Sequence, residues 1–287
     1  MGISLCRNRG VDGLTEESQF LTFMGIRVHF SVSQPEGTLK NRVLLLSSPL
    51  INTFHWRKLL PELSQLGCMT VMVDLPGFGR SDCAEEVPMD PDLRASILWG
   101  ILDNVDSATD APLSLWHLMG HGSACPTILC MANQYPDSVK SQIHLSPIFS
   151  LELRGADKEK LSRWYDATMR SEERFRDLIE HYCGYPLDDY ILDRMRRPLL
   201  RQGAKENFLR MLKHAAKTPE EGSAGFIPTM AIWGGRDLLM TKSAVSSIHG
   251  LLPDAETHVL KSAGHFPMET HSKAIRDYLR GWIRYNE

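Results

Sequence analysis

Cysteine is scarce and scattered in this sequence. The 287 residues include six cysteines, and none of them belongs to a CxxC pair. This spacing excludes a dense disulfide framework and favours free thiols in a reducing compartment. No apolar run approaches the roughly 18 residues of a membrane span, and the N-terminus lacks the apolar stretch of a signal peptide. We therefore expect a cytoplasmic protein that makes no contact with a membrane.

A strong excess of either charge is also missing. The formal net charge is −3 at pH 7, so the chain lacks the positive surface that nucleic acid or an anionic membrane attracts. Its 43% hydrophobic and 23% charged residues are typical of a soluble globular protein. The partner that we expect is a small-molecule substrate, and the composition leaves the oligomeric state open.

Short apolar runs alternate with segments of helical spacing over most of the chain. The predicted strands are residues 19–23, 26–33, 42–47, 69–74, 113–119, 142–145, 228–233 and 256–260, and the predicted helices between and after them are 56–66, 91–105, 124–134, 243–251 and 272–284. Such alternation is typical of βαβ units. The sequence therefore predicts an α/β fold with a mostly parallel central sheet and helices on both of its faces.

One segment interrupts the alternation. Residues 151–225 are rich in Arg, Glu, Asp and Leu and show helical periodicity without strand signals, over 158–169, 171–183, 189–195 and 205–216. This segment is predicted to be a helical insertion. The α/β core then comprises residues 19–150 and 226–287, and residues 1–18 are expected to be a loose lead-in.

The turn at Gly120-His121-Gly122-Ser123-Ala124 stands between a predicted strand and a predicted helix. This is the layout of a nucleophile elbow, in which a sharp turn presents a nucleophile above a sheet. The third position should carry Ser, Cys or Asp, and it carries Gly122 instead. Glycine adopts the positive φ of such a turn almost freely, so Gly122 suits the shape of the turn and withholds its nucleophile.

Four parts of the chain resemble the α/β-hydrolase superfamily in their order and spacing. They are residues 44–50 with 54–57, the loop 74–82 (DLPGFGRSD), the turn 120–124, and the pair 232–237 and 263–268. The resemblance implies an α/β-hydrolase fold in which the helical insertion forms a lid over the active site. It also implies that the loop 263–268 carries the catalytic base and that the loop 232–237 carries the acid that orients it.

The resemblance places a catalytic pair at His265 and Asp237. An imidazole titrates near neutral pH, so His265 is expected to act as a general base. Asp237 is expected to accept the other imidazole N–H and to fix the tautomer. Together with the elbow position Gly122, these two residues make up the expected catalytic centre.

The expected oxyanion hole departs from the family pattern. In the family, the residue after the nucleophile donates one backbone hydrogen bond, which assigns that role to Ser123. Pro49 falls at the second donor position and has no N–H, so Leu50 donates only if the loop is shifted. The hydroxyls of Ser47 and Ser48 are possible side-chain donors, whereas the Ser123 hydroxyl is expected at the start of a helix.

The substrate pocket should lie above the carboxyl ends of the strands and beneath the insertion. The residues expected to bind substrate, beside the oxyanion residues, are Ser47, Ser48, Phe54, Phe149, Trp164, Leu238 and Phe266. Most of them are apolar, which favours a small hydrophobic acyl or aromatic substrate.

Three functions fit these residues. The first is hydrolysis of a small apolar ester-type or related acyl substrate by the His265–Asp237 pair; either a water replaces the missing nucleophile, or Gly122 is an engineered substitution of a serine. The second is a cofactor-free lyase, cyclase or oxygenase with His265 as its base. The third is a ligand-binding protein without catalysis. None of the three requires a metal or a cofactor.

Overall fold

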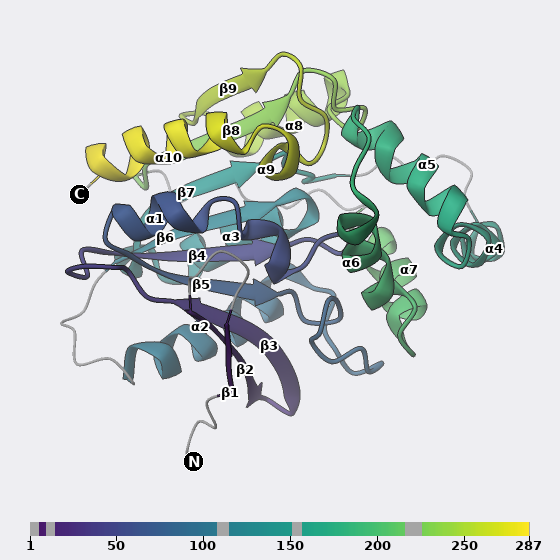
Figure 1. The fold of residues 1–287 in the computed structure, drawn as a ribbon, viewed down its shortest axis with the longest axis horizontal. Coiled ribbons are helices and arrows are strands. Elements are labelled where there is room, and N and C mark those ends of the chain that lie inside the picture. The colour runs from purple at the N-terminus through teal and green to yellow at the C-terminus, as the bar shows by residue number, and fades with distance from the viewer. Residues whose placement is uncertain (1–5, 10–14, 108–114, 151–156, 216–225, 287) are drawn as a thin grey trace.

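A single mixed sheet organises the molecule. The computed structural model describes residues 6–9, 15–107, 115–150, 157–215 and 226–286. Within them the strand order is β1-β2-β3-β5-β4-β6-β7-β8-β9 (Figure 1). The strands are β1 Cys6–Arg9, β2 Thr15–Phe23, β3 Ile26–Ser33, β4 Asn41–Ser47, β5 Cys68–Asp74, β6 Trp116–His121, β7 Val139–Leu145, β8 Thr229–Gly234 and β9 Glu256–Leu260.

Parallel pairing dominates the sheet, as the alternating pattern predicted. From β5 through β4, β6, β7 and β8 to β9 every pair is parallel, whereas β1, β2, β3 and β5 pair antiparallel. Every residue of β4, β5, β6 and β8 is buried. Strands covered on both faces read as continuous apolar runs, which is why these four were visible in the sequence.

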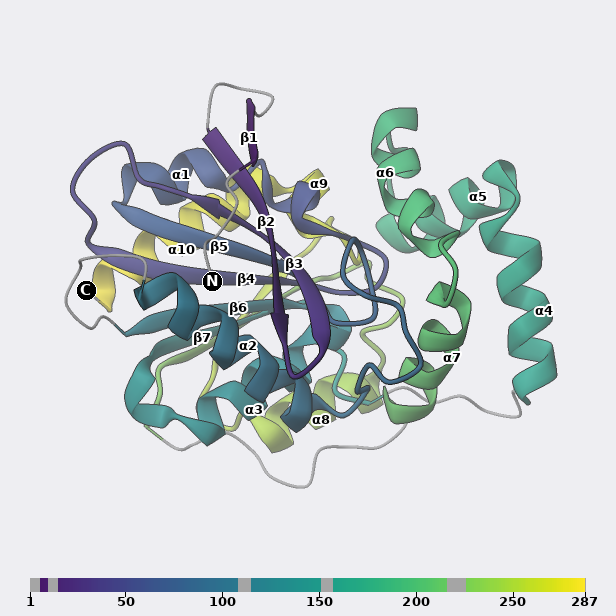
Figure 2. The same ribbon diagram turned by 90° about the horizontal axis from the view of Figure 1, so that it is seen from below.

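Helices cover both faces of the sheet. α1 (Leu60–Gln65) and α10 (Ser272–Tyr285) pack together on one face, and α2 (Pro91–Ser107) packs with α3 (Cys125–Gln134) on the other (Figure 2). The remaining helices outside the insertion are the 3-10 turns η1 (Thr53–Trp56), η2 (Gly122–Ala124) and η3 (Pro136–Ser138) and the helices α8 (Lys242–Leu251) and α9 (Pro267–Thr270).

The insertion between β7 and β8 is helical, as predicted. Its helices are α4 (Lys158–Met169), α5 (Glu172–Cys183), α6 (Asp189–Leu199) and α7 (Ala204–Ala215), and they stand together beyond one end of the sheet (Figures 1 and 2). Side-chain caps begin three of them, because Asp157, Ser171 and Asp188 each accept a backbone N–H of the first turn. The predicted limits of the insertion, at residues 151 and 225, lie outside the described residues.

The predicted lead-in over residues 1–18 differs from the structure. Residues 6–9 form β1, and residues 15–18 belong to β2, which pairs with both β1 and β3. An antiparallel edge strand is held by backbone hydrogen bonds, so a polar sequence gives no apolar signal for it. The predicted helix 56–66 is also shorter, since Pro61 stands in the first turn of α1 and proline favours a helix start.

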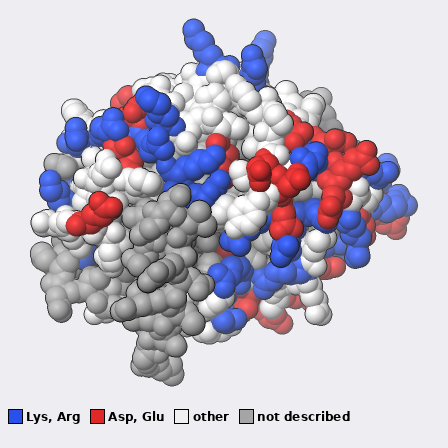
Figure 3. Space-filling model, in the orientation of Figure 1, with Lys and Arg blue, Asp and Glu red and all other residues white. Residues whose placement is uncertain are grey.

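The surface and the cysteines agree with the composition. Cys68, Cys83, Cys125, Cys130 and Cys183 are free thiols. Figure 3 shows both signs of charge interspersed over one face of the molecule. Among the described helices, none is both long enough and apolar enough to cross a bilayer.

Candidate active site

The carboxyl ends of four parallel strands carry the expected site residues. Ser48 follows β4, Gly122 follows β6, Asp237 follows β8 and His265 follows β9. His121 is extended, and Gly122 turns the chain at φ +56° into η2 and then α3. This is the sharp strand-to-helix turn that the sequence predicted. Because these strands are parallel, their carboxyl ends meet at one edge of the sheet.

His265 and Asp237 form a buried hydrogen-bonded pair. The Nδ1–H of His265 donates to Oδ2 of Asp237 at 2.8 Å, and the two residues are only 3% and 6% exposed. The backbone N–H of Leu239 donates to the other carboxylate oxygen at 2.9 Å. With Asp237 accepting at Nδ1–H, the Nε2 of neutral His265 is left with a lone pair that can accept a proton.

The insertion holds the loop that carries this histidine. The backbone N–H of His265 donates to the carbonyl of Tyr182 in α5 at 2.8 Å. The approach is so close that a Cβ on Gly264 would lie 2.2 Å from the carbonyl oxygen of Cys183. Only glycine fits there, so the spacing between the catalytic loop and α5 depends on Gly264.

Gly122 leaves a niche beside the His265 imidazole. A Cβ placed on Gly122 would lie 3.5 Å from Nε2 of His265, 3.4 Å from Cβ of Ser48 and 3.5 Å from Oγ of Ser48. These are ordinary van der Waals distances. The niche therefore accepts a Cβ in contact with both Ser48 and His265.

Ser48 faces this niche with its hydrogen-bond direction fixed. Nε2 of His121 lies 2.8 Å from the carbonyl oxygen of His265, and a carbonyl only accepts, so Nε2 of His121 carries the proton. Burial, and next the charge of His265, keep the pKa of His121 well below its usual range. Nδ1 of this neutral ring therefore accepts the Ser48 hydroxyl hydrogen, at 2.9 Å between the heavy atoms.

This hydrogen bond corrects the expectation that Ser47 and Ser48 supply oxyanion donors. The Ser48 hydrogen is used by His121, so only oxygen lone pairs of Ser48 face the niche. Ser47 is buried and accepts a hydrogen bond from Nε1 of Trp56 at 2.9 Å. The sequence placed both hydroxyls in the expected oxyanion loop, but the fold determines which group accepts the hydrogen of each.

A cavity of about 330 Å³ adjoins His265. Six of the expected oxyanion and binding residues line it, namely Ser48, Pro49, Leu50, Ser123, Trp164 and Phe266. The insertion also lines it, with side chains that were not expected there: Leu161, Leu178, Tyr182, Phe208, Met211 and Leu212. Their spacing of three or four residues within α4, α5 and α7 is the helical periodicity that could have identified them.

Four expected binding residues lie elsewhere. Ser47 is one of them, since it is buried. Phe54 is another, and the guanidinium groups of Arg57 and Arg194 lie 4.0 Å and 4.8 Å from the centre of its ring. Phe149 belongs to a separate apolar cluster beneath α8. Leu238 is 51% exposed, and its neighbour Leu239 lines the cavity instead. The order of residues in a loop does not reveal which side chain points inward, and the expectation was wrong by one residue there.

The cavity is apolar in character. Among the described residues that line it, none is Lys, Arg, Asp or Glu, and His265 is its one titratable group apart from Tyr182. Among all the residues that the structure describes, no cluster of three or more His, Cys, Asp or Glu side chains is arranged to hold a metal ion.

Comparison with known proteins places this site in a family. Residues 48–278 match the model of the alpha/beta hydrolase family. Among curated relatives, a 2-hydroxy-6-oxononadienedioate/2-hydroxy-6-oxononatrienedioate hydrolase of Burkholderia vietnamiensis is 22% identical over 273 residues, which cover 90% of this chain and 91% of the relative. The protein of the same name from Escherichia coli K12 is 21% identical, with the same coverage.

Solved structures share the fold at lower identity. A meta-cleavage product hydrolase from Pseudomonas fluorescens superposes with a TM-score of 0.74 at 16% identity, covering 94% of this chain and 98% of the other. The haloalkane dehalogenase DatA of Agrobacterium tumefaciens superposes with a TM-score of 0.73 at 16% identity, covering 95% and 97%. Proteins with different named activities thus share this architecture. The fold alone therefore does not determine the reaction, which depends on the residues of the site.

Proposed function

The chain belongs to the alpha/beta hydrolase family, and on that premise we propose that it hydrolyses a compact, uncharged acyl compound with a water molecule as the nucleophile. His265 is the base, Asp237 orients it, and the niche at Gly122 holds the water. The observation that supports this proposal is that both polar groups facing the niche, Nε2 of His265 and Oγ of Ser48, are hydrogen-bond acceptors.

A water in the niche finds two hydrogen-bond acceptors, one on His265 and one on Ser48. Nε2 of His265 presents a lone pair because Nδ1–H is used by Asp237. Oγ of Ser48 presents lone pairs because its hydrogen is used by His121. A water that donates one hydrogen to each keeps its own lone pairs free to attack a carbonyl carbon. The positions of both acceptors relative to Gly122 support this placement.

The proton movements follow from this arrangement. The water oxygen bonds to the acyl carbon while one of its protons moves to Nε2 of His265, and Asp237 stabilises the imidazolium that forms. When the tetrahedral intermediate collapses, the bond to the leaving group breaks and His265 returns the proton to it. The products are the acid and the alcohol or thiol, and His265 is neutral again.

The oxyanion needs a donor, and the chain provides fewer than usual. We assign the backbone N–H of Ser123, at the start of the η2–α3 turn where helix N–H groups are unpaired, as the first donor. Pro49 lines the cavity at the second position and has no N–H to give. Loss of one oxyanion donor reduces the rate by about 10²–10³, so a slow enzyme is expected unless Leu50 donates.

The cavity favours an uncharged substrate. The curated relatives are named for a dioate, a compound with two carboxylate groups. Two carboxylates buried against apolar side chains need cationic partners, and the described residues that line this cavity include neither Arg nor Lys. A short ester or thioester with aliphatic or aromatic groups matches both the apolar lining and the volume of about 330 Å³.

A panel of 4-nitrophenyl and thiol esters of increasing acyl length tests the proposal. The unchanged chain should hydrolyse short apolar esters, and His265→Ala should reduce kcat by about 10²–10⁴, the usual contribution of a general base. Ser48→Ala should lower kcat with a smaller change in KM, because it removes one contact of the attacking water. Hydrolysis that survives His265→Ala would reject this mechanism.

Ligand binding without turnover is the second candidate, and Pro49 together with Gly122 favours it, since two parts of a usual hydrolase site are absent. The same ester panel separates the two functions. Tight binding of an apolar ester, no hydrolysis, and no effect of His265→Ala on affinity would establish the binding protein. A third outcome is that the protein removes a proton from a carbon atom of such a ligand and that His265→Ala abolishes this reaction. His265 would then be the base of a cofactor-free lyase or oxygenase.

A further inference from the structure

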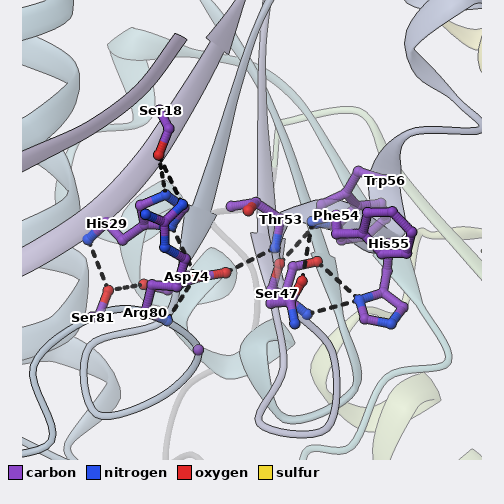
Figure 4. A network of polar contacts seen from close by, with 12 residues as sticks. Ser18, His29, Ser47, Thr53, Phe54, His55, Trp56, Asp74, Arg80 and Ser81 are labelled. Carbon is purple, nitrogen blue, oxygen red and sulfur yellow. Dashed lines mark hydrogen bonds and ion pairs between the residues drawn. The ribbon is translucent and has the colours of Figure 1, made fainter. Parts of the chain in front are cut away.

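A hydrogen-bonded series of a serine, a histidine and an aspartate lies outside the cavity. It joins Ser18 of β2, His29 of β3 and Asp74 at the end of β5 (Figure 4). Oγ of Ser18 is 2.9 Å from Nε2 of His29, and Nδ1 of His29 is 2.8 Å from Oδ2 of Asp74. These are the distances expected of a nucleophile, its base and the group that orients the base.

The aspartate of this series is fixed by three hydrogen bonds. Asp74 accepts the backbone N–H of Thr53 at 2.8 Å and that of Arg80 at 2.9 Å, in addition to the histidine. Asp74 and His29 are each 1% exposed. A carboxylate oxygen accepts at this contact, which fixes the Nδ1–H tautomer of His29. Nε2 of His29 is then an acceptor.

The serine end is oriented by a cation. Nη1 of Arg80 donates to Oγ of Ser18 at 2.9 Å. A guanidinium only donates, so Ser18 accepts there and directs its own hydrogen to Nε2 of His29. Ser18 is partly exposed and Arg80 is exposed, so the hydroxyl can be reached from solvent while its base and the carboxylate are protected from it.

We propose that Ser18 is a second nucleophile, which accepts an acyl group from small activated esters in solution. Oγ of Ser18 bonds to the acyl carbon while its proton passes to Nε2 of His29. The bond to the leaving group then breaks, and the leaving group takes the proton from His29. The negative charge develops on the carbonyl oxygen of the ester, and the cationic guanidinium of Arg80, 2.9 Å from Oγ of Ser18, lies beside it. The acyl group stays on Ser18, so the step is a single acylation and adds no turnover to the hydrolysis of the ester panel.

Covalent labelling with a fluorophosphonate tests this assignment, because the probe bonds to activated serine oxygens with loss of fluoride. Peptide mass spectrometry should find the adduct on Ser18. Ser96 is a suitable internal control, since its hydroxyl donates to the backbone carbonyl of Asp92 and has no histidine partner. Labelling of Ser18 at a rate no greater than that of Ser96 would overturn the proposal.

Variants identify what activates Ser18. Ser18→Ala should remove the adduct, and His29→Gln should slow labelling by about 100-fold or more. Arg80→Gln, a change at an exposed residue, gives an independent readout if His29→Gln does not fold, and it should also slow labelling. Rates unchanged in Arg80→Gln and in a folded His29→Gln would show a structural network only. His265→Ala should leave the labelling of Ser18 unchanged, so this outcome does not depend on the reaction proposed for the cavity.

Discussion

Filling the niche at Gly122 with two side chains of nearly equal size gives a sensitive test of the water mechanism. Both Gly122→Ala and Gly122→Ser place a Cβ at 3.4–3.5 Å from Ser48 and His265, without a steric clash. Both force a non-glycine residue to adopt φ +56°, which costs about 1–3 kcal/mol. For a domain of this size, that cost corresponds to a fall in Tm of roughly 2–6 °C. The pair therefore shares one stability cost and differs by one hydroxyl.

The two variants should differ in chemistry. In Gly122→Ala the methyl group occupies the place of the water, so hydrolysis should fall by about 10²-fold or more, as after loss of the general base. In Gly122→Ser the hydroxyl lies one bond beyond a Cβ that is 3.5 Å from Nε2 of His265, within hydrogen-bonding reach. This variant should form a covalent acyl-enzyme at position 122, with a burst of 4-nitrophenolate that exceeds the burst of the unchanged chain by one equivalent of protein.

The assay combines burst kinetics with intact-protein mass spectrometry at the same ester concentration. The double variant Gly122→Ser/His265→Ala serves as the control, because it retains the hydroxyl and lacks the base. If Gly122→Ala hydrolyses esters as fast as the unchanged chain, then the niche does not hold the nucleophile and the reasoning is refuted. Adduct formation at position 122 that does not need His265 would refute the role of the base.

Three further predictions concern the oxyanion donor, a buried ion pair and two buried histidines. Pro49→Ala restores a backbone N–H at the cavity and should raise kcat on short esters by about tenfold or more; an unchanged kcat would show that the donor is supplied elsewhere. Although burial raises the pKa of Glu269, the hydrogen bond from Arg57 holds that pKa below its usual value, so Glu269→Gln should reduce the unfolding free energy by about 3–5 kcal/mol at pH 7. In urea titrations that difference should persist above the unfolded-state pKa near 4.5 and shrink as the pH falls below it. Burial lowers the pKa of His117 to about 4 and that of His144 to about 3, so the unfolded state binds protons at these residues before the folded state does. The unfolding free energy should therefore fall between pH 6.5 and 4, by about 1.4 kcal/mol per pH unit for each histidine. His144→Phe should lessen that slope in denaturation curves at pH 7, 5.5 and 4.5.

The central sheet could be predicted because burial leaves a mark on sequence. β4, β5, β6 and β8 are buried along their whole length, and each is a nearly unbroken apolar run. β1 left no such mark, because an edge strand is held by backbone hydrogen bonds that any residue type can make. The same reason explains why the first residues of β2 were expected to be a loop.

The candidate site was predicted in part for a different reason. The loops with Asp237 and His265 were found through their resemblance to a family, and the structure brings these two side chains to 2.8 Å. The partners of Ser48 and Ser18 were not foreseen, since a hydrogen bond between His121 and Ser48 joins residues 73 positions apart. Local patterns report the face of a helix or strand, and they do not report which distant side chain lies opposite.

The most direct test of the water mechanism is a crystal structure of the unchanged chain at a resolution that shows ordered water. A well-ordered water is expected in the niche at Gly122, within about 3.2 Å of both Nε2 of His265 and Oγ of Ser48, and Gly122→Ala should displace it. A niche without water, or one occupied by a protein side chain, would contradict the assignment of water as the nucleophile.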